Sequence, residues 1–436
     1  MQGYLLKANG GYKVTNLFIK RKAVTVVDSI MGSGKTSWAI QYVNGSNNKT
    51  KFMFVTPYLT EVNRIKESTT KDFVEPGSQD GKLTHLKELV RKGKNIVCSH
   101  ELLKRTDSEL IELIEAEHYT LILDEVMDVI SDIDMSSDDI RLLLNSKDDI
   151  GNPTISINSK GKVQWNNPEY MSGSYEVIRN LSNADRLMLH EEKKILKMYW
   201  LFPPQLFKAF EDIYILTYMF NGQIQSYYYN LFNFEYEFRS VKYSEDRGYQ
   251  LVDYIPPANE DREHLKKLIT IHYSTPRDKN DLNLIGDKTS ALSKNHLLDV
   301  KTKPHLRKKF KDNGYNFYFH KARVKPSQVI WTSFKVMERP LLIKGLKNRF
   351  VPVNARATNE YADATTCIYF ANRYMNPITK RFFIDKGIKV NEELFALSEM
   401  LQWLFRSAIR NDEPITVYIP SKRMRVLLEM YLDNQI

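Results

Sequence analysis

The sequence predicts an α/β protein of two lobes, each with a parallel sheet, and a small insertion in or after the first lobe. Between 24 and 123, short runs rich in Val, Ile, Leu and Phe alternate with amphipathic helical stretches. Strands that alternate with helices indicate a parallel sheet covered on both faces. The chain has 436 residues, of which 42% are hydrophobic, so it is long for one hydrophobic core and sufficient for two.

The first lobe is expected to hold four buried strands with helices between them. The strands are expected at 24–27, 52–55, 96–98 and 120–123. The helices are expected at 37–44, 59–68 and 101–118. A polar cluster follows each strand, and the ligands of parallel sheets bind at the carboxyl ends of the strands. Functional residues are therefore expected in these clusters.

The rest of the chain predicts an insertion and a second lobe. From 131 to 182 the composition shifts to Asp, Ser, Asn and Gly, with a hairpin-like alternation at 154–165. We therefore expect the first lobe at 1–222, an inserted subdomain at 131–182 and the second lobe at 223–436. The other expected elements are helices at 183–199 and 392–410 and strands at 213–220, 227–238, 328–334, 350–353, 366–370 and 415–419.

The net charge of +10 is concentrated in one stretch. Residues 300–350 contain fourteen lysines and arginines against two acidic residues, Asp312 and Glu338. A concentrated positive field suits a polyanion such as nucleic acid, because each phosphate contact releases bound counterions. A basic surface that serves only solubility is the alternative interpretation.

The sequence also predicts the compartment. No apolar run approaches the ~20 residues that a membrane-spanning helix needs, and the N-terminus lacks the pattern of a secretory signal. The two cysteines, Cys98 and Cys367, are far apart and have no metal-ligand spacing near them. These features predict a cytoplasmic protein, in the host cytoplasm if the chain is viral, without a disulfide framework or a Cys-based zinc site.

A phosphate-binding loop is predicted at 28–36, between the first strand and a helix. Gly32 and Gly34 let the backbone curl so that its N–H groups point at phosphate oxygens, and the helix N-terminus adds a positive dipole. Lys35 is expected to reach the β- and γ-phosphates, and the Thr36 hydroxyl to hold Mg²⁺. Ser29 stands where the usual pattern has its first glycine. The complete set of expected nucleotide-binding residues is Gly32, Ser33, Gly34, Lys35, Thr36 and Ser37.

An acidic pair, Asp124 and Glu125, directly follows the strand expected at 120–123. Asp124 suits the outer shell of the Mg²⁺, and Glu125 suits the base that polarises an attacking water. Taken alone, such a pair is more often a helix N-cap. Its place on the same sheet as a phosphate loop favours the catalytic interpretation.

Two arginines are predicted on one helix near the C-terminus. Gln402, Arg406 and Arg410 are spaced at i, i+4 and i+8, so they share a face if 392–410 is helical. Two arginines so close repel each other unless an anion lies between them. A γ-phosphate is such an anion if the second lobe brings both guanidinium groups to it, and the arginines would then stabilise its charge in the transition state. The alternative is an exposed helix whose arginines pair with carboxylates such as Glu399.

These motifs resemble a known family. The segments 29–36, 124–128 and 402–410 resemble motifs I, II and VI of the superfamily 2 helicases, and the chain is similar to helicase-like proteins of bacteriophage replication modules. The segments that resemble motif Ia, the motif after the next strand, motif III and motif V are 54–59, 97–100, 215–218 and 354–359.

The resemblance implies two RecA-like P-loop NTPase lobes that bind ATP and Mg²⁺ between them. It implies that Thr217 couples the nucleotide state to lobe closure. The residues that it implies for nucleic-acid contact are Thr56, Pro57, Arg64, Ser99, His100, Arg356, Thr358 and Asn359. The chain departs from the family at Met127 and Phe405, and a Gln motif that reads adenine is not evident near the N-terminus.

The implied activity is that of an ATP-dependent helicase or translocase, with DNA favoured over RNA, replication proteins as candidate partners and a role in phage DNA replication or recombination. One alternative is a replication-initiation scaffold that uses ATP only as a switch, although such a protein could lose Glu125 and both arginines. A terminase-type packaging ATPase is a weaker alternative. It would need clustered nuclease carboxylates in the second half, where the basic stretch lies instead.

Overall fold

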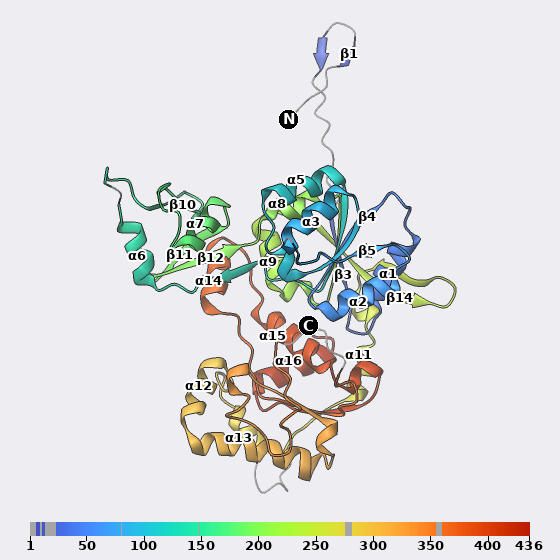
Figure 1. Cartoon of the computed structure of the whole chain (residues 1–436). Helices are drawn as coiled ribbons and strands as arrows, with labels where there is room; N and C mark the ends of the chain where they lie inside the picture. Colours follow the sequence, from blue (N-terminus) through green and yellow to red (C-terminus); the bar gives the residue numbers. More distant parts are fainter. Residues whose placement is uncertain are drawn as a thin grey trace.

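The computed structural model describes residues 6–8, 11–13, 23–79, 81–147, 149–274, 281–354 and 360–436. Two α/β lobes lie one above the other, and an insertion projects sideways from the first (Figure 1). The predicted fold class is confirmed. Among the described helices, none combines the length and the apolar character that a membrane span requires.

The first lobe is built on a sheet of eight strands in the order β15-β14-β3-β13-β7-β4-β6-β5. All neighbours pair in parallel except β14 and β15, which form an antiparallel hairpin at one edge. The strands are β3 (Val24–Asp28), β4 (Lys51–Thr56), β5 (Phe73–Val74), β6 (Asn95–Ser99), β7 (Tyr119–Asp124), β13 (Asp212–Thr217), β14 (Tyr236–Ser244) and β15 (Gly248–Asp253). The four strands predicted between 24 and 123 are therefore confirmed.

Helices cover both faces of this sheet. They are α1 (Lys35–Gly45), α2 (Leu59–Ser68), α3 (Lys82–Arg91), α4 (His100–Leu103), α5 (Ser108–Glu117), α8 (Pro204–Ala209) and α9 (Ile224–Leu231). The single helix predicted at 101–118 is wrong, because the chain breaks into α4 and α5. Thr106 donates its hydroxyl to the carbonyl of Leu103 at 2.6 Å, and Asp107 caps the new helix by accepting from the Leu110 N–H at 3.0 Å.

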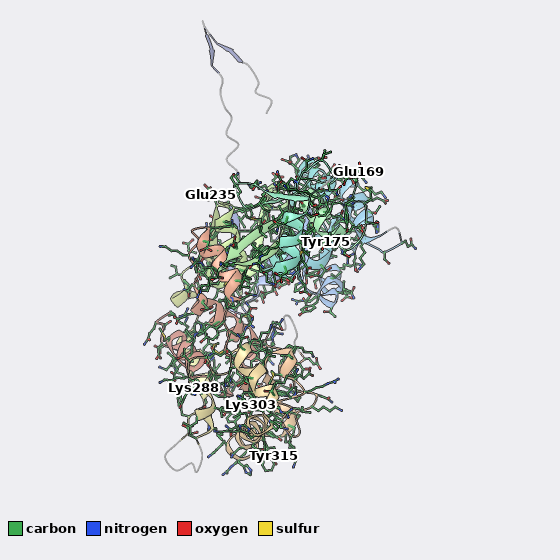
Figure 2. All side chains as sticks on the ribbon, turned by 90° about the vertical axis from the view of Figure 1, so that its left-hand side faces the viewer. Glu169, Tyr175, Glu235, Lys288, Lys303 and Tyr315 are labelled. Atoms are coloured by element: carbon green, nitrogen blue, oxygen red, sulfur yellow. The ribbon has the colours of Figure 1, made fainter. Side chains whose placement is uncertain are left out.

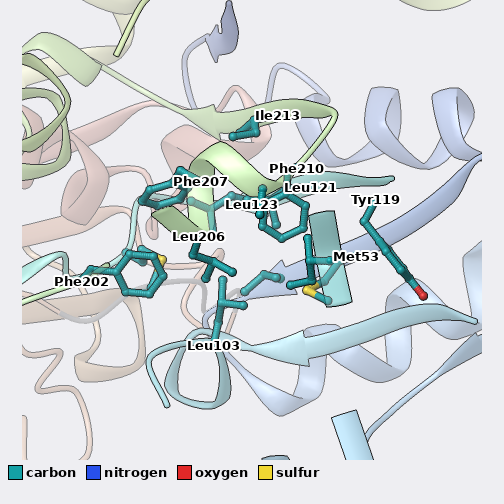
Figure 3. Packing of buried hydrophobic residues seen from close by; sticks show 14 of the residues in the cluster. Met53, Leu103, Tyr119, Leu121, Leu123, Phe202, Leu206, Phe207, Phe210 and Ile213 are labelled. Atoms are coloured by element: carbon teal, nitrogen blue, oxygen red, sulfur yellow. The ribbon is translucent and has the colours of Figure 1, made fainter. Parts of the chain in front are cut away.

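The core of the first lobe lies on the two faces of its sheet. Along β7, Leu121 and Leu123 pack into one cluster and Ile122 packs into the cluster on the opposite face. Figure 3 shows Leu121 and Leu123 among aromatic and aliphatic side chains that include Phe207 and Met53. Because both faces are buried, the strand is apolar along its length rather than alternating, which is the pattern that predicted it.

The insertion has its own small core. Its elements are β8 (Ile130–Asp132), α6 (Ser137–Asn145), β9 (Ile155–Ile157), β10 (Val163–Trp165), α7 (Glu176–Asn183), β11 (Leu187–Glu192) and β12 (Ile195–Leu201). The hairpin predicted at 154–165 is confirmed as β9 and β10. The helix predicted at 183–199 is wrong, because β11 and β12 pair as an antiparallel hairpin. Its two-residue turn places Lys193 and Lys194 at positive φ, 48° and 68°, which matches the turns that hairpins favour.

The second lobe has a four-stranded parallel sheet in the order β16-β19-β18-β17. Its strands are β16 (Ile269–Ile271), β17 (Val329–Thr332), β18 (Thr366–Tyr369) and β19 (Ile415–Tyr418). Its helices are α11 (Arg262–Leu268), α12 (Lys294–Thr302), α13 (Pro304–Asn316), α14 (Pro377–Asp385), α15 (Glu392–Leu404) and α16 (Lys422–Leu432), and the short helix α10 (Pro256–Asn259) precedes them. Outside both lobes, β1 (Leu6–Ala8) pairs with β2 (Gly11–Lys13).

Two predicted strands in this half are wrong. Residues 350–353 contribute only one isolated bridge, between Phe350 and Trp331. The aromatic run at 227–238 forms the end of α9 and the start of β14, and β14 lies in the first sheet. Its tyrosines Tyr228 and Tyr229 pack into the core of the first lobe from a helix. A run of aromatic residues has the same apolar character in a buried helix as in a strand.

The insertion also contacts the second lobe. Met188 and Tyr199 of the insertion pack in one apolar cluster with Phe382 and Phe383 of α14. Figure 1 shows α14 beside β11 and β12, and Figure 2 shows Tyr175 of the insertion at the level of the first lobe. The two lobes are therefore joined by this contact as well as by the chain.

A candidate nucleotide site between the two lobes

The loop between β3 and α1 has the backbone of a phosphate cradle. Gly32 and Gly34 adopt φ values of 83° and 90°, in the left-handed region that side-chain-bearing residues rarely enter. Gly34 directly precedes the first residue of α1, Lys35. The N–H groups of the loop and of the first helical turn therefore lie together at the carboxyl end of β3.

Ser29 fits at the start of this loop because its side chain is tied to the neighbouring strand. Its hydroxyl accepts a hydrogen bond from the N–H of Val241 in β14 at 2.8 Å. Its own N–H donates to the carbonyl of Thr217 in β13 at 3.1 Å. The serine that replaces the usual glycine thus links the loop to both strands that flank β3.

Lys35 and Thr36 project from the N-terminus of α1 toward the acidic pair. The Lys35 ammonium donates to the carbonyls of Ser29 and Ile30 at 2.6 and 3.0 Å. Burial lowers the pKa of Lys35, although the nearby carboxylates, Glu125 first among them, oppose that shift. The Thr36 hydroxyl lies 3.4 Å from Oδ1 of Asp124.

Asp124 and Glu125 lie where β7 ends. Burial raises the pKa of the Asp124 carboxyl to about 7, and the adjacent Glu125 adds to the rise. Glu125 has a positive φ of 61°, and its N–H donates to the carbonyl of Leu216 at 2.9 Å. Its Oε2 is buried and has no hydrogen-bond partner among the described residues. A turned backbone and an unpartnered carboxylate oxygen are features of functional sites.

The arginines near the C-terminus do not share a helical face, so that prediction is wrong. The helix α15 ends at Leu404, Arg406 lies in the turn that follows, and Arg410 lies in the 3-10 helix Ala408–Asn411. The helix ends because Ser407 donates both its N–H and its hydroxyl to the carbonyl of Leu404, at 3.0 and 2.6 Å. The chain is then held by a bond from the Ala408 N–H to the carbonyl of Ala364 at 2.9 Å.

Both arginines nevertheless line one cavity with the phosphate loop. A cavity of about 240 Å³ between the lobes is lined by Gly32, Gly34, Lys35, Thr36, Ser37, Asp124 and Glu125 of the first lobe and by Gln402, Phe405, Arg406 and Arg410 of the second. The carbonyl oxygen of Arg410 lies only 3.7 Å from the position that a Cβ on Gly32 would occupy. Figure 1 shows α15 and α16 of the second lobe facing the first lobe.

The two guanidinium groups from the second lobe are largely shielded from solvent in this cavity. Arg406 is only 4% exposed, and burial lowers the pKa of Arg410, with the charge of Arg64 adding to the effect. The hydroxyl of Ser33 is buried in the loop without a hydrogen-bond partner among the described residues. Partly buried guanidinium groups beside a loop of backbone N–H groups are suited to an anionic ligand.

The residues predicted to contact nucleic acid do not all lie together. Pro57 and His100 line a second cavity between the lobes, of about 370 Å³, together with Asn354 of the second lobe. Arg64 lies elsewhere, because it lines the nucleotide cavity and pairs with Glu61 at 2.9 Å. The residues of the motif V-like segment, Arg356, Thr358 and Asn359, lie outside the described residues.

Thr56 and Ser99 end neighbouring strands, as predicted. The hydroxyl of Thr56 is buried without a partner among the described residues, whereas Ser99 accepts the N–H of Leu102 at 3.4 Å and caps α4. His100 is buried, and its Nε2 lies 3.0 Å from the carbonyl oxygen of Asp124. His100 thus connects the second cavity to the acidic pair of the first.

The segment at the end of β13 connects the same two cavities to the second lobe. Thr217 donates its hydroxyl to Oε1 of Gln223 at 3.1 Å, and Gln223 lines the second cavity. The next residue, Tyr218, contacts Glu260 and Tyr431 through its hydroxyl. Tyr218 lies in the segment that resembles motif III but had no predicted role, and sequence reasoning missed Glu260 and Tyr431, because no local pattern relates residues so far apart in the chain.

Comparison with known proteins finds one prophage-derived relative and two matching domain families. Residues 263–432 match the family described as the YonV C-terminal Rossmann-like domain, and 130–200 match the YonV middle domain. The SPbeta prophage-derived protein YonV of Bacillus subtilis (strain 168) is 38% identical over 427 residues, which is 94% of this chain and 99% of that protein.

Solved structures resemble the chain weakly. Xpd4 of S. tokodaii is similar with a TM-score of 0.49 and 11% identity, over 96% of this chain and 95% of that one. An XPD helicase is similar with a TM-score of 0.41 and 11% identity, over 94% of each chain. The DUF1998 helicase MrfA bound to DNA and AMPPNP is similar with a TM-score of 0.35 and 12% identity, over 95% of this chain and 49% of MrfA.

Proposed function

The chain belongs to the YonV family, and from the cavity that its two lobes enclose we propose that it hydrolyses ATP with Mg²⁺ to move along nucleic acid as a helicase-type motor. The observation that carries the proposal is the convergence of Lys35 and Glu125 from the first lobe with Arg406 and Arg410 from the second on one cavity. Each of these side chains has a defined task in phosphoryl transfer.

The phosphates fit the loop and its flanking residues. The N–H groups around Gly32 and Gly34 and the ammonium of Lys35 hold the β- and γ-phosphate oxygens. These ligands replace the carbonyls of Ser29 and Ile30 that Lys35 now contacts. The Thr36 hydroxyl and the Asp124 carboxylate, 3.4 Å apart, provide the oxygen ligands that Mg²⁺ prefers. When bound, Mg²⁺ supplies charge neutralisation for the phosphates.

The remaining residues act on the reacting atoms. Glu125 accepts the proton of the attacking water through its unpartnered carboxylate oxygen. Arg406 and Arg410 stabilise the charge that develops on the γ-phosphoryl group, and Gln402 orients the group beside them. Because the arginines come from the second lobe, the complete site exists only when the lobes are closed.

Lobe closure is transmitted through the end of β13. Thr217 pairs in register with Asp28, the last residue of β3, and bonds to Gln223 in the second cavity. Tyr218 contacts the second lobe. A change in the nucleotide site therefore reaches both the second cavity and the lobe interface through consecutive residues.

Nucleic acid is the proposed polyanion. The second cavity joins Pro57, His100 and Asn354 from segments that resemble strand-contacting motifs of both lobes. The basic surface extends from the end of α12 through α13 to the chain after it, and α13 lies on the side of the second lobe away from the first (Figure 1). Its exposed members are Lys301, Lys303, Lys308, Lys309, Lys321, Arg323, Lys325, Lys335, Arg339, Lys344 and Lys347. The prophage origin of the relative favours DNA and a role in phage replication or recombination.

We propose a domain boundary that differs from the one expected at 223. The strands β14 and β15 belong to the first sheet, and the second sheet begins at β16. The match to a Rossmann-like domain starts at 263. The boundary between the lobes therefore lies between Asp253 and Ile269, and the insertion extends over 130–200.

The direct test is ATP turnover with and without single-stranded DNA or RNA, for the unaltered chain and for Lys35→Ala. We expect turnover that nucleic acid stimulates and that the substitution abolishes. A Lys35→Ala chain as active as the parent would end the proposal, and turnover without stimulation would favour an ATP-switched scaffold. Strand displacement on forked DNA and RNA duplexes then separates unwinding from translocation.

A further inference from the structure

We propose that Tyr249 forms the surface on which the nucleotide base stacks, so that the β14–β15 hairpin is the base-binding element of this chain. The inference rests on the proposed function, because it assigns a subsite of the same cavity. Tyr249 lies on β15 and is one of the residues that line the nucleotide cavity.

The ring of Tyr249 lies directly against the phosphate loop. A Cβ added to Gly34 would lie 2.0 Å from Cε1 of Tyr249, so the ring occupies the space that any side chain at this position would need. Gly34 is the residue before α1, whose N-terminus holds the phosphates in the proposed site. The aromatic ring of Tyr249 therefore borders the loop on the first lobe, and the residue is only partly buried.

The hairpin is fixed to α1 by one side chain. Gln41 of α1 accepts from the Tyr249 N–H at 3.0 Å and donates to the carbonyls of Tyr249 and Arg247 at 3.1 and 3.2 Å. Gly248 permits the close approach, since a Cβ there would lie 2.4 Å from Oε1 of Gln41. The phosphate loop precedes α1 and the Tyr249 backbone is bonded to Gln41 of the same helix, so the loop and Tyr249 are positioned relative to each other before a nucleotide binds.

Base stacking predicts a pattern of ligand affinities that differs from the pattern expected if Tyr249 only supported the phosphate loop. An aromatic side chain contacts the face of a base and does not read its edge, so adenine and guanine gain similar affinity from it. Inorganic tripolyphosphate has the phosphates without the base. Removing the Tyr249 ring should therefore weaken ATP and GTP together and leave tripolyphosphate binding unchanged.

The test measures the affinities of ATP, GTP and tripolyphosphate, each with Mg²⁺, for the full chain by calorimetry. We expect Tyr249→Ala to weaken ATP and GTP by about tenfold, and Tyr249→Phe to restore both, because the stacking surface is retained. The matched control is Tyr243→Ala. Tyr243 is a neighbour on β14 whose ring lies 5.0 Å from that of Tyr249 and which is 58% exposed.

The outcomes separate the inference from the proposed function. Equal weakening of tripolyphosphate and ATP in Tyr249→Ala would show that the ring acts through the loop, and unchanged ATP affinity would show that it does not touch the base. An equal loss in Tyr243→Ala would assign the effect to hairpin folding. Each of these results overturns the stacking role and leaves the motor intact. Wild-type protein that binds none of the three ligands overturns the proposed function itself.

Discussion

The hydroxyl groups of Tyr218 and Tyr431 lie 2.7 Å apart, although the first residue follows β13 of the first lobe and the second lies in α16 of the second. Both are within hydrogen-bond distance of Oε2 of Glu260, at 3.0 and 3.1 Å. The Arg262 guanidinium neutralises that carboxylate at 3.0 Å. The network is buried, so its bonds are little weakened by solvent and depend on the lobes being in this arrangement.

The first prediction concerns this network. Tyr218→Phe should raise the KM for ATP by roughly fivefold, because a buried hydrogen bond contributes about 1 kcal/mol to the closed arrangement. Stimulation of turnover by single-stranded DNA should fall as well. The control is Tyr119→Phe, which removes a hydroxyl that donates to the carbonyl of Lys94 within the first lobe, at 2.7 Å. Equal effects of the two substitutions would show that Tyr218 contributes only stability.

The second prediction concerns the proposed base. Glu125→Gln should lower the ATP turnover rate by roughly 10²–10⁴-fold, because an amide cannot accept the proton of the attacking water. ATP affinity should change little, since Glu125 does not hold the phosphates. Single-turnover hydrolysis and calorimetric binding measure the two effects separately. Glu101→Gln, at an exposed carboxylate of the second cavity, should leave turnover unchanged. Substantial activity in Glu125→Gln would assign the base to another residue.

The third prediction uses the position of Arg64. Because Arg64 lines the nucleotide cavity beside Glu61 and close to the charge of Arg410, Arg64→Ala should alter ATP binding rather than nucleic-acid binding. We expect the KM for ATP to change by a few-fold and the affinity for single-stranded DNA to stay the same. Fluorescence anisotropy with labelled DNA checks the second point. A selective loss of DNA affinity would restore the role that the helicase resemblance implies.

Local patterns predicted the parts of this site that lie in one segment. The phosphate loop, its strand and its helix are adjacent in the chain, so glycine spacing and apolar periodicity predict their geometry. The acidic pair is equally local, because it directly follows the apolar residues of β7. The arginines were predicted to reach the cavity for a reason that proved wrong, since Ser407 ends the helix before Arg406. The spacing of the arginines does not reveal that the Ser407 hydroxyl binds the carbonyl of Leu404 and ends the helix there.

Contacts between distant segments could not be predicted from the sequence. Tyr249 borders the loop only because β14 and β15 extend the first sheet beyond β3, which places an edge hairpin over α1. The aromatic run before β14 was assigned to strands because helix and strand are both apolar when they are buried. The lobe boundary expected at 223 rests on the same assignment, because the aromatic run is taken there as the start of the second lobe.

The fourth prediction concerns the basic surface. Replacing Lys301 and Lys309 with glutamate should weaken binding to single-stranded DNA and reduce the slope of log affinity against log salt by about two, because each phosphate contact contributes about one to the slope. Basal ATP turnover should not change. The control is the same charge reversal at Lys92 and Lys94, exposed lysines of the first lobe. An unchanged slope would mean that this surface only maintains solubility.

The last prediction concerns pH. The Asp28 carboxylate accepts the N–H groups of Met219 and Phe220, both at 2.8 Å, and so fixes the end of β3 to the chain after β13. Burial raises the pKa of Asp28 to about 6, although these bonds and the charge of Lys35 oppose the rise. The folded protein therefore holds this proton more tightly than the unfolded chain, in which an aspartate has a pKa of about 4.

The sign of the effect follows from that difference. The stabilisation that protonated Asp28 provides is complete below about pH 4 and is lost as the pH rises through about 6. The urea midpoint of the unaltered chain should therefore fall relative to that of Asp28→Asn between pH 4.5 and 7, since asparagine cannot titrate. A difference between the two midpoints that stays constant over this range would mean that Asp28 is ionised throughout. The two N–H bonds would then have a larger effect on the pKa of Asp28 than burial has.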